Sequence, residues 1–147
     1  CHDPLIREGD MEELMAYVKA VPAIVPVSKN NAAIVPVEVD ARNFDRACFI
    51  ISTGAFGASA TFACKAQKAA TSGGSLSDVT SAALTNLTTA GASKIYCLEV
   101  KVDSDKPYLK LSGTAGTSTV LHSAICLLYG GSRSYPIVSG LTQYVRH

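Results

Sequence analysis

The chain has 147 residues, a formal net charge of +1 and a charged fraction of 17%. A globular chain of this length buries roughly 70% of its unfolded surface, which suffices for one domain without disulfides or a structural metal. Soluble domains usually carry roughly 25% charged residues, and phosphate binding depends on clustered Lys and Arg. The composition therefore argues against nucleic acid as a partner. It also suggests a surface that is partly covered in use, because proteins of low net charge tend to associate.

The sequence contains no signal for a membrane or a secretory route. No apolar run reaches the roughly 18 residues of a transmembrane helix, and no charged segment followed by an apolar one resembles a signal peptide. Four of the five cysteines (Cys1, Cys48, Cys64, Cys97 and Cys126) lie in apolar, strand-like runs, without a CxxC pair or a Cys/His cluster. We interpret them as reduced thiols, mostly buried, in a protein made in a cytoplasm.

Residues 1–20 differ from the rest of the chain because they mix charged and apolar residues at loose helical spacing. Asp10, with Glu13 three residues later, matches a capping box and favours a short helix. Such a short helix is marginal alone. We expect an N-terminal arm over residues 1–20, for which a short helix is one option, and a single β-sandwich domain over residues 21–147.

The pentapeptide Ala-Ile-Val-Pro-Val occurs at residues 23–27 and again at residues 33–37. Each copy has the composition of a β-strand, but Pro26 and Pro36 lack the backbone donor that a central strand requires. The residues between the copies have turn chemistry. Two interpretations of residues 21–39 stay open: an edge hairpin of the domain, or an extended arm whose apolar residues dock on a neighbouring subunit.

From residue 21 onward the pattern is that of β-strands. Ala47–Thr53 and His122–Tyr129 are apolar on both faces, which predicts buried central strands. Ala60–Gln67 and Lys94–Asp103 alternate between apolar and polar residues, and Pro107–Ser112 follows the latter across a short turn, which suggests a hairpin.

Residues 76–87 fit a short helix and a loop plus strand equally well. Short strands at intervals of about ten residues, joined by Gly/Ser turns, predict an all-β fold. The expected architecture is an antiparallel β-sandwich, jelly-roll-like, with an extended N-terminal arm.

The sequence shows no constellation of catalytic residues. It has no G-x-S-x-G elbow, phosphate-binding loop, HExxH helix or GxGxxG turn. His2 and His147 are terminal, and His122 begins a strand without an acid nearby in the sequence, which indicates a structural role. Asp103 and Asp105 resemble the start of a calcium loop, but the Gly and Glu that complete it are missing. We expect no enzymatic activity, no metal and no cofactor.

From residue 16 to residue 136 the chain resembles a family of small head proteins of tailed bacteriophages. After the Pro-containing segment, four motifs carry the resemblance: DARNFDRA at Asp40–Ala47, DVTSA at Asp78–Ala82, KPYLK at Lys106–Lys110 and LYGGSR at Leu128–Arg133. The resemblance implies a capsid decoration protein (a cement or minor capsid protein). Such a protein is a β-sandwich subunit on the outside of an icosahedral shell, present as a homotrimer.

We therefore expect a structural virion protein, assembled in the host cytoplasm, that binds the outside of the capsid and stabilises it by bridging neighbouring capsomers. Its partners are the major capsid protein and further copies of itself, not nucleic acid or a membrane. The residues expected at the subunit or capsid interface are Val21, Ile24, Val25, Pro26, Ile34, Val35, Pro36, Arg42 and Arg46. The alternative is a head-spike or tail module that recognises host glycans through an aromatic groove near Tyr129, Tyr135 and Tyr144.

Overall fold

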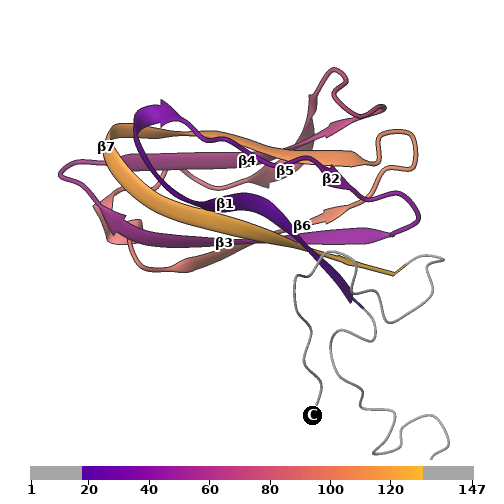
Figure 1. Ribbon diagram of the computed structural model, residues 1–147, viewed down its shortest axis with the longest axis horizontal. Helices are drawn as coiled ribbons and strands as arrows, with labels where there is room; N and C mark the ends of the chain where they lie inside the picture. Colours follow the sequence, from indigo (N-terminus) through magenta and orange to yellow (C-terminus); the bar gives the residue numbers. More distant parts are fainter. Residues whose placement is uncertain (1–17, 131–147) are drawn as a thin grey trace, which may run out of the picture.

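The computed structural model describes residues 18–130 (Figure 1). The helix expected near the N-terminus, His2, His147, Tyr135 and Tyr144 lie outside these residues. The elements are β1 (Val18–Ala33), β2 (Val39–Asp40), β3 (Arg46–Phe56), β4 (Thr61–Ala69), β5 (Ser77–Ala83), η3 (Thr89–Gly91), β6 (Ile95–Lys101) and β7 (Tyr108–Tyr129). The strands pair antiparallel, so the all-β, antiparallel prediction is confirmed.

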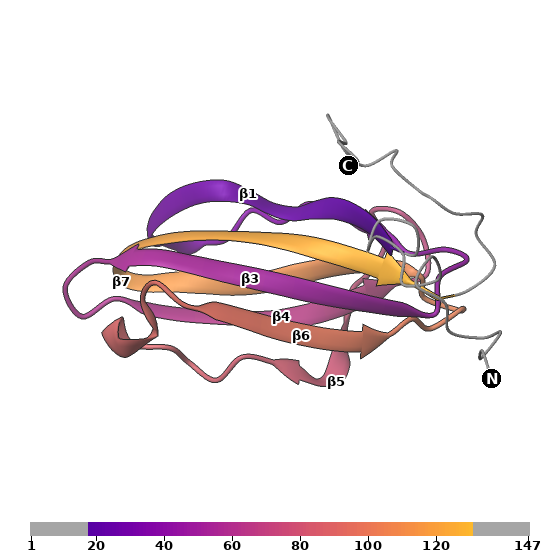
Figure 2. The same ribbon diagram turned by 90° about the horizontal axis from the view of Figure 1, so that it is seen from below.

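The sheet is organised around β7, which is 22 residues long. Its first part pairs with β4, its second part pairs with β3, and β1 runs along most of its length. The resulting strand order is β5-β4-β7-β3-β6, with β1 and β2 also paired to β7. β5 and β6, at the two ends of this order, approach each other without pairing. The sheet therefore folds into a near-closed, barrel-like shape, with β1 and β5 on opposite sides in Figure 2.

The sheet bends at one end of the barrel, where β1, β7 and the β3–β4 connection turn together (left in Figure 1). Asn31 in β1 has φ 46° and Thr117 in β7 has φ 69°, both in the left-handed region. The Asn31 side-chain oxygen accepts a hydrogen bond from the Thr117 backbone N–H at 3.2 Å. The Gly57 N–H donates to the Thr119 carbonyl at 2.7 Å. These bonds join the three bends into one corner.

The core fills the space that the folded sheet encloses. Inward-facing side chains alternate with outward-facing ones along each long strand, as the period of two in a strand requires. Phe49, Phe62 and Ile51 are fully buried there. At Gly113 in β7 a Cβ atom would collide with the Ala63 carbonyl of β4, so only glycine permits this close approach.

Two strand predictions need correction. The expected hairpin between residues 94–103 and 107–112 is wrong, because β6 pairs with β3 and the start of β7 pairs with β4. The turn between them contains only an isolated bridge between Asp103 and Lys106. The strands expected at 107–112 and 122–129 are parts of the single strand β7. Residues 77–83 form a strand, which settles the choice that the sequence left open.

The two Ala-Ile-Val-Pro-Val copies form an edge of the barrel. The first copy lies in β1, and the second begins at the last residue of β1 and continues into the connection to β2. In each copy the Ile is buried (Ile24 1% and Ile34 6% exposed) and the next Val is exposed (Val25 59% and Val35 62%). The Val37 N–H donates to the Ala23 carbonyl at 2.8 Å. The copies therefore meet, but not as the two strands of a hairpin.

Candidate interaction surface

The most conspicuous surface of the barrel is the side of β1, β7, β3 and β6 that points away from the core. The register places Pro22, Ile125, Ile50 and Cys97 in one row across these four strands. Neighbouring rows are built in the same way. We call this surface the outer face, defined by Pro22, Val25, Pro26, Cys48, Ile50, Ser52, Ile95, Cys97, Leu121, Ser123, Ile125 and Leu127.

The outer face exposes large apolar side chains. Ile95 is 72% exposed, and Leu121 and Ile125 are each 47% exposed. In β7 the latter two alternate with residues of the core, namely Val120, Ala124 and Cys126. A contiguous apolar patch of this kind on a soluble domain indicates a site of contact with another molecule.

This arrangement explains why β3 and the second part of β7 are apolar on both faces. Both strands are central in the sheet, as predicted, but only one side of each is buried. Phe49 faces the core, whereas Ile50 is only half-buried on the outer face. The apolar residues on the second side therefore form the outer face, which none of the strands within residues 18–130 covers.

Charged side chains border the outer face at the end where β7 reaches Tyr129. Arg46, Tyr129 and Lys101 form the last row there. The Arg46 guanidinium lies 3.8 Å from the Glu99 carboxylate, and the Tyr129 hydroxyl donates to Glu99 at 2.7 Å. The bond to Glu99, with burial, raises the pKa of Tyr129 to about 12. The Tyr129 hydroxyl is thus already engaged.

The structure divides the residues predicted for the interface. Val25 and Pro26 lie on the outer face, at a bulge of β1 opposite Ser123, and Arg46 lies at its charged end. Ile24 and Ile34 are core residues, so they are not available for docking in this fold. Val21 is half-buried and packs against the same core.

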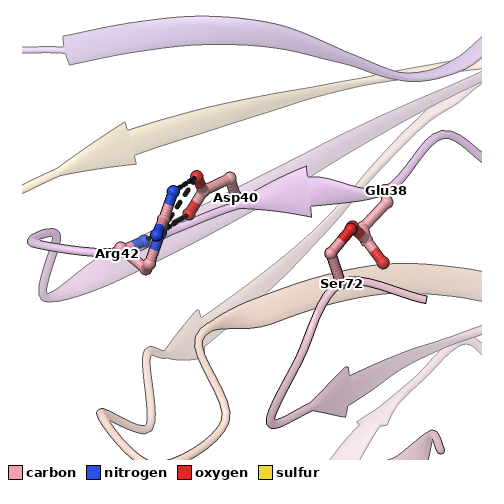
Figure 3. Close-up of polar contacts among 4 residues, drawn as sticks. All are labelled: Glu38, Asp40, Arg42 and Ser72. Atoms are coloured by element: carbon pink, nitrogen blue, oxygen red, sulfur yellow. Dashed lines mark hydrogen bonds and ion pairs between the residues drawn. The ribbon is translucent and has the colours of Figure 1, made fainter. Parts of the chain in front are cut away.

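The remaining predicted residues lie away from the outer face. Val35 and Pro36 belong to the connection between β1 and β2. Arg42 follows β2 and makes a two-pronged contact with Asp40, with Nε–Oδ1 at 2.9 Å and Nη2–Oδ2 at 2.7 Å (Figure 3). Its guanidinium also lies 5.5 Å from the centre of the Tyr108 ring. Arg42 is therefore held by its own chain.

A second polar contact near Arg42 fastens a loop to the barrel. The Glu38 carboxylate accepts hydrogen bonds from the Ser72 hydroxyl at 2.5 Å and the Gly73 N–H at 2.9 Å (Figure 3). These bonds, the one from Gly73 first, hold the pKa of Glu38 below its ordinary value. The contact fixes the β4–β5 loop against the segment that precedes β2.

Sequence reasoning missed four central residues of the outer face: Ile50, Ile95, Leu121 and Ile125. The available signal was the apolar character of both faces of two strands. That signal predicts burial and does not distinguish a core from a docking surface, because an apolar side chain suits both.

His122 lies inside the barrel and not at a surface site. It is 3% exposed, its Nδ1 lies 3.0 Å from the Val120 carbonyl, and its ring centre lies 5.0 Å from that of Phe62. Its Nε2 is buried without a hydrogen-bond partner. Burial is the main cause that lowers the pKa of His122.

Two shallow hollows open elsewhere on the barrel. One, of about 190 Å³, is mainly apolar and lies beside Leu84 and Thr114. The other, of about 410 Å³, is polar and includes Lys68 and Asp103, which form an ion pair at 3.3 Å. Within residues 18–130, no group of three or more His, Cys, Asp or Glu side chains could hold a metal ion.

A comparison with protein-family models finds no match, and a search of curated proteins also finds none. In the part of the chain that the structure describes, no helix has the length and hydropathy needed to span a membrane. The outer face is therefore the strongest candidate for a functional site.

Proposed function

We propose that this protein is a structural virion protein that binds the outside of an assembled icosahedral phage capsid and stabilises it by bridging neighbouring capsomers. One observation carries the proposal. The outer face combines exposed apolar side chains, such as Ile95 and Ile125, with a charged border at the end where β7 reaches Tyr129. Such a surface suits a broad contact with another protein.

The outer face is small for a stable interface between two proteins, and this size favours a partner that offers many equivalent binding sites. Four strands about 4.8 Å apart and about eight residues long, at about 3.3 Å per residue, give a footprint on the order of 500 Å². Stable interfaces bury roughly 800 Å² per partner. One such contact is weak, but several copies held together on a shell gain affinity through avidity.

The mechanism we propose is linkage between binding and assembly. A protein that binds the assembled shell and not its free subunits shifts the equilibrium toward the shell. The resemblance to small phage head proteins supports the major capsid protein as the partner, a homotrimer as the bound form and the capsid surface as the location. The bend of β7, whose two parts pair with different strands, supports a jelly-roll-like sandwich as the parent topology.

Co-sedimentation with mature and with unexpanded shells of the same phage tests the proposal. We expect saturable binding to mature shells alone, at a fixed ratio to the capsid subunit. Absence of binding to both kinds of shell contradicts the proposal and makes glycan screening the next experiment.

A further inference from the structure

Two cysteines lie next to each other on the outer face. In the pairing of β3 with β6, Cys48 is opposite Glu99 and Cys97 is opposite Ile50, so the two cysteines are diagonal neighbours that point to the same side. Cys97 is exposed and Cys48 is half-buried. Burial, and after it the neighbouring Cys97 side chain, raises the pKa of Cys48 to about 12.

The other described cysteines have different surroundings. Cys64 and Cys126 are buried among the core residues, and burial raises the pKa of each thiol to about 12. The raised pKa makes these two thiols, and that of Cys48, weak nucleophiles toward a reagent in solution. Cys48 differs from the other two because it lies beside another cysteine on the outer face. Of the four cysteines in residues 18–130, Cys97 is the one that solvent reaches most readily. Chemistry with a soluble reagent should therefore start at Cys97.

We infer that Cys48 and Cys97 form a reversible disulfide by exchange with a small disulfide such as glutathione disulfide. The Cys97 thiolate attacks one sulfur of the reagent, forms a mixed disulfide and releases one glutathione thiolate. The Cys48 thiol then attacks the Cys97 sulfur at close range, and its proton passes to the departing glutathione thiolate. This step forms the bond between β3 and β6 and releases the second glutathione. The protein loses two protons and two electrons, and the reagent gains them to become two molecules of glutathione.

The geometry indicates a labile bond and not a permanent staple. Diagonal neighbours in an antiparallel pair have Cα atoms about 7–8 Å apart, whereas a disulfide usually spans about 4.4–6.8 Å. β6 pairs with β3 alone, so a local shift of β6 along β3 breaks no second ladder of hydrogen bonds. A disulfide formed with such strain is easily reduced. This inference concerns the chemistry of the outer face and does not depend on capsid binding.

Mass spectrometry of the full chain with Cys1→Ser tests the inference after incubation with glutathione disulfide. We expect a mass loss of two hydrogens, a proteolytic peptide that links Cys48 to Cys97, and full reversal by dithiothreitol. In the matched variant that also carries Cys48→Ser, we expect glutathione to remain attached to Cys97.

Three results overturn the inference: a stable glutathione adduct on Cys97 when Cys48 is present, a covalent dimer through Cys97, or no reaction at either cysteine. Far-UV circular dichroism of each variant shows that the barrel is folded during the reaction. Shell binding is measured separately, so failure of the disulfide and failure of the proposed function are distinguished.

Discussion

At the scale of single residues, His122 sets the response of the barrel to acid. Its imidazole is buried among apolar groups with Nε2 unpartnered, and Lys29 adds a repulsive positive charge. The folded protein therefore holds His122 neutral, whereas the unfolded chain takes up a proton as the pH falls through about 6.5. Protonation of His122 in the unfolded chain therefore does not reduce the free energy of unfolding above that pH. Below it, the free energy of unfolding decreases by at most about 1.4 kcal/mol per pH unit for one such group.

We predict that His122→Phe reduces this loss of stability between pH 7.5 and pH 5. Phe is apolar and of similar shape, and it can pack against Phe62 without an ionisable group. Urea denaturation of both proteins at several pH values gives the comparison. Carboxylates with lowered pKa values, such as Asp78 and Asp103, contribute only in more acidic solution, below about pH 4.5. Equal pH dependence in both proteins contradicts the prediction.

Thr117 is a second residue that affects the stability of the folded state, because its φ of 69° is unfavourable for a β-branched side chain. We predict that Thr117→Gly stabilises the protein by about 1 kcal/mol, because glycine adopts this conformation freely. The neighbouring Thr119, which has no positive φ, is the matched control: Thr119→Gly should destabilise by about 0.5–1 kcal/mol. Thermal and urea unfolding check both values. Destabilisation by both changes shows that the corner tolerates Thr117 without strain.

At the scale of elements, the two interpretations of the repeated pentapeptide differ in whether the fold requires β1. β1 pairs with β7 from Val18 to Ala33, and Ile24 and Ile34 belong to the core. We predict that a chain without residues 1–37 fails to fold, because this deletion removes one edge of the sheet. A chain without residues 1–17 keeps every described strand and should unfold cooperatively.

Circular dichroism and limited proteolysis distinguish the two truncated chains. If the chain that lacks residues 1–37 folds but no longer binds shells, the prediction is contradicted. That result supports the docking-arm interpretation, because the fold then does not require β1 whereas shell binding does.

The elements also show how far sequence reasoning extends. Alternation in Lys94–Asp103 and the apolar runs of β3 and β7 predicted strands, because a strand's period of two leaves a local trace in the sequence. Pairing between strands leaves no such trace. The short turn at Ser104–Lys106 suggested a hairpin between the strands on either side of it. In the structure this turn joins β6, which pairs with β3, to the start of β7, which pairs with β4. The continuity of β7 was also missed, because strands were predicted only at residues 107–112 and 122–129.

The candidate site was only partly predictable for a related reason. Val25, Pro26 and Arg46 were expected at an interface and do lie on or beside the outer face. The residues at its centre, such as Ile50 and Ile125, come from strands far apart in the sequence. Only the register of β7 with β3 brings them together. Ile24 shows the opposite limit, since composition alone could not assign it to the core.

At the scale of the whole molecule, a near-closed barrel needs apolar residues on its inner side only. The apolar outer face is therefore not required by the fold. Large apolar side chains are nevertheless exposed to solvent there, and this exposure is the reason for assigning the outer face a partner. The opposite side of the barrel offers a suitable control surface: Thr80 lies in β5, is exposed and is not part of the outer face.

The most direct test of capsid binding through the outer face is co-sedimentation of Ile125→Asp and Thr80→Asp with mature shells, beside the unmodified protein. Both substitutions place a charge at an exposed position, and equal urea denaturation midpoints establish that both variants fold. We expect Thr80→Asp to bind like the unmodified protein and Ile125→Asp to lose at least about tenfold in affinity, since about 1.4 kcal/mol corresponds to this factor. Equal binding by all three proteins contradicts the assignment of the outer face as the capsid-binding surface.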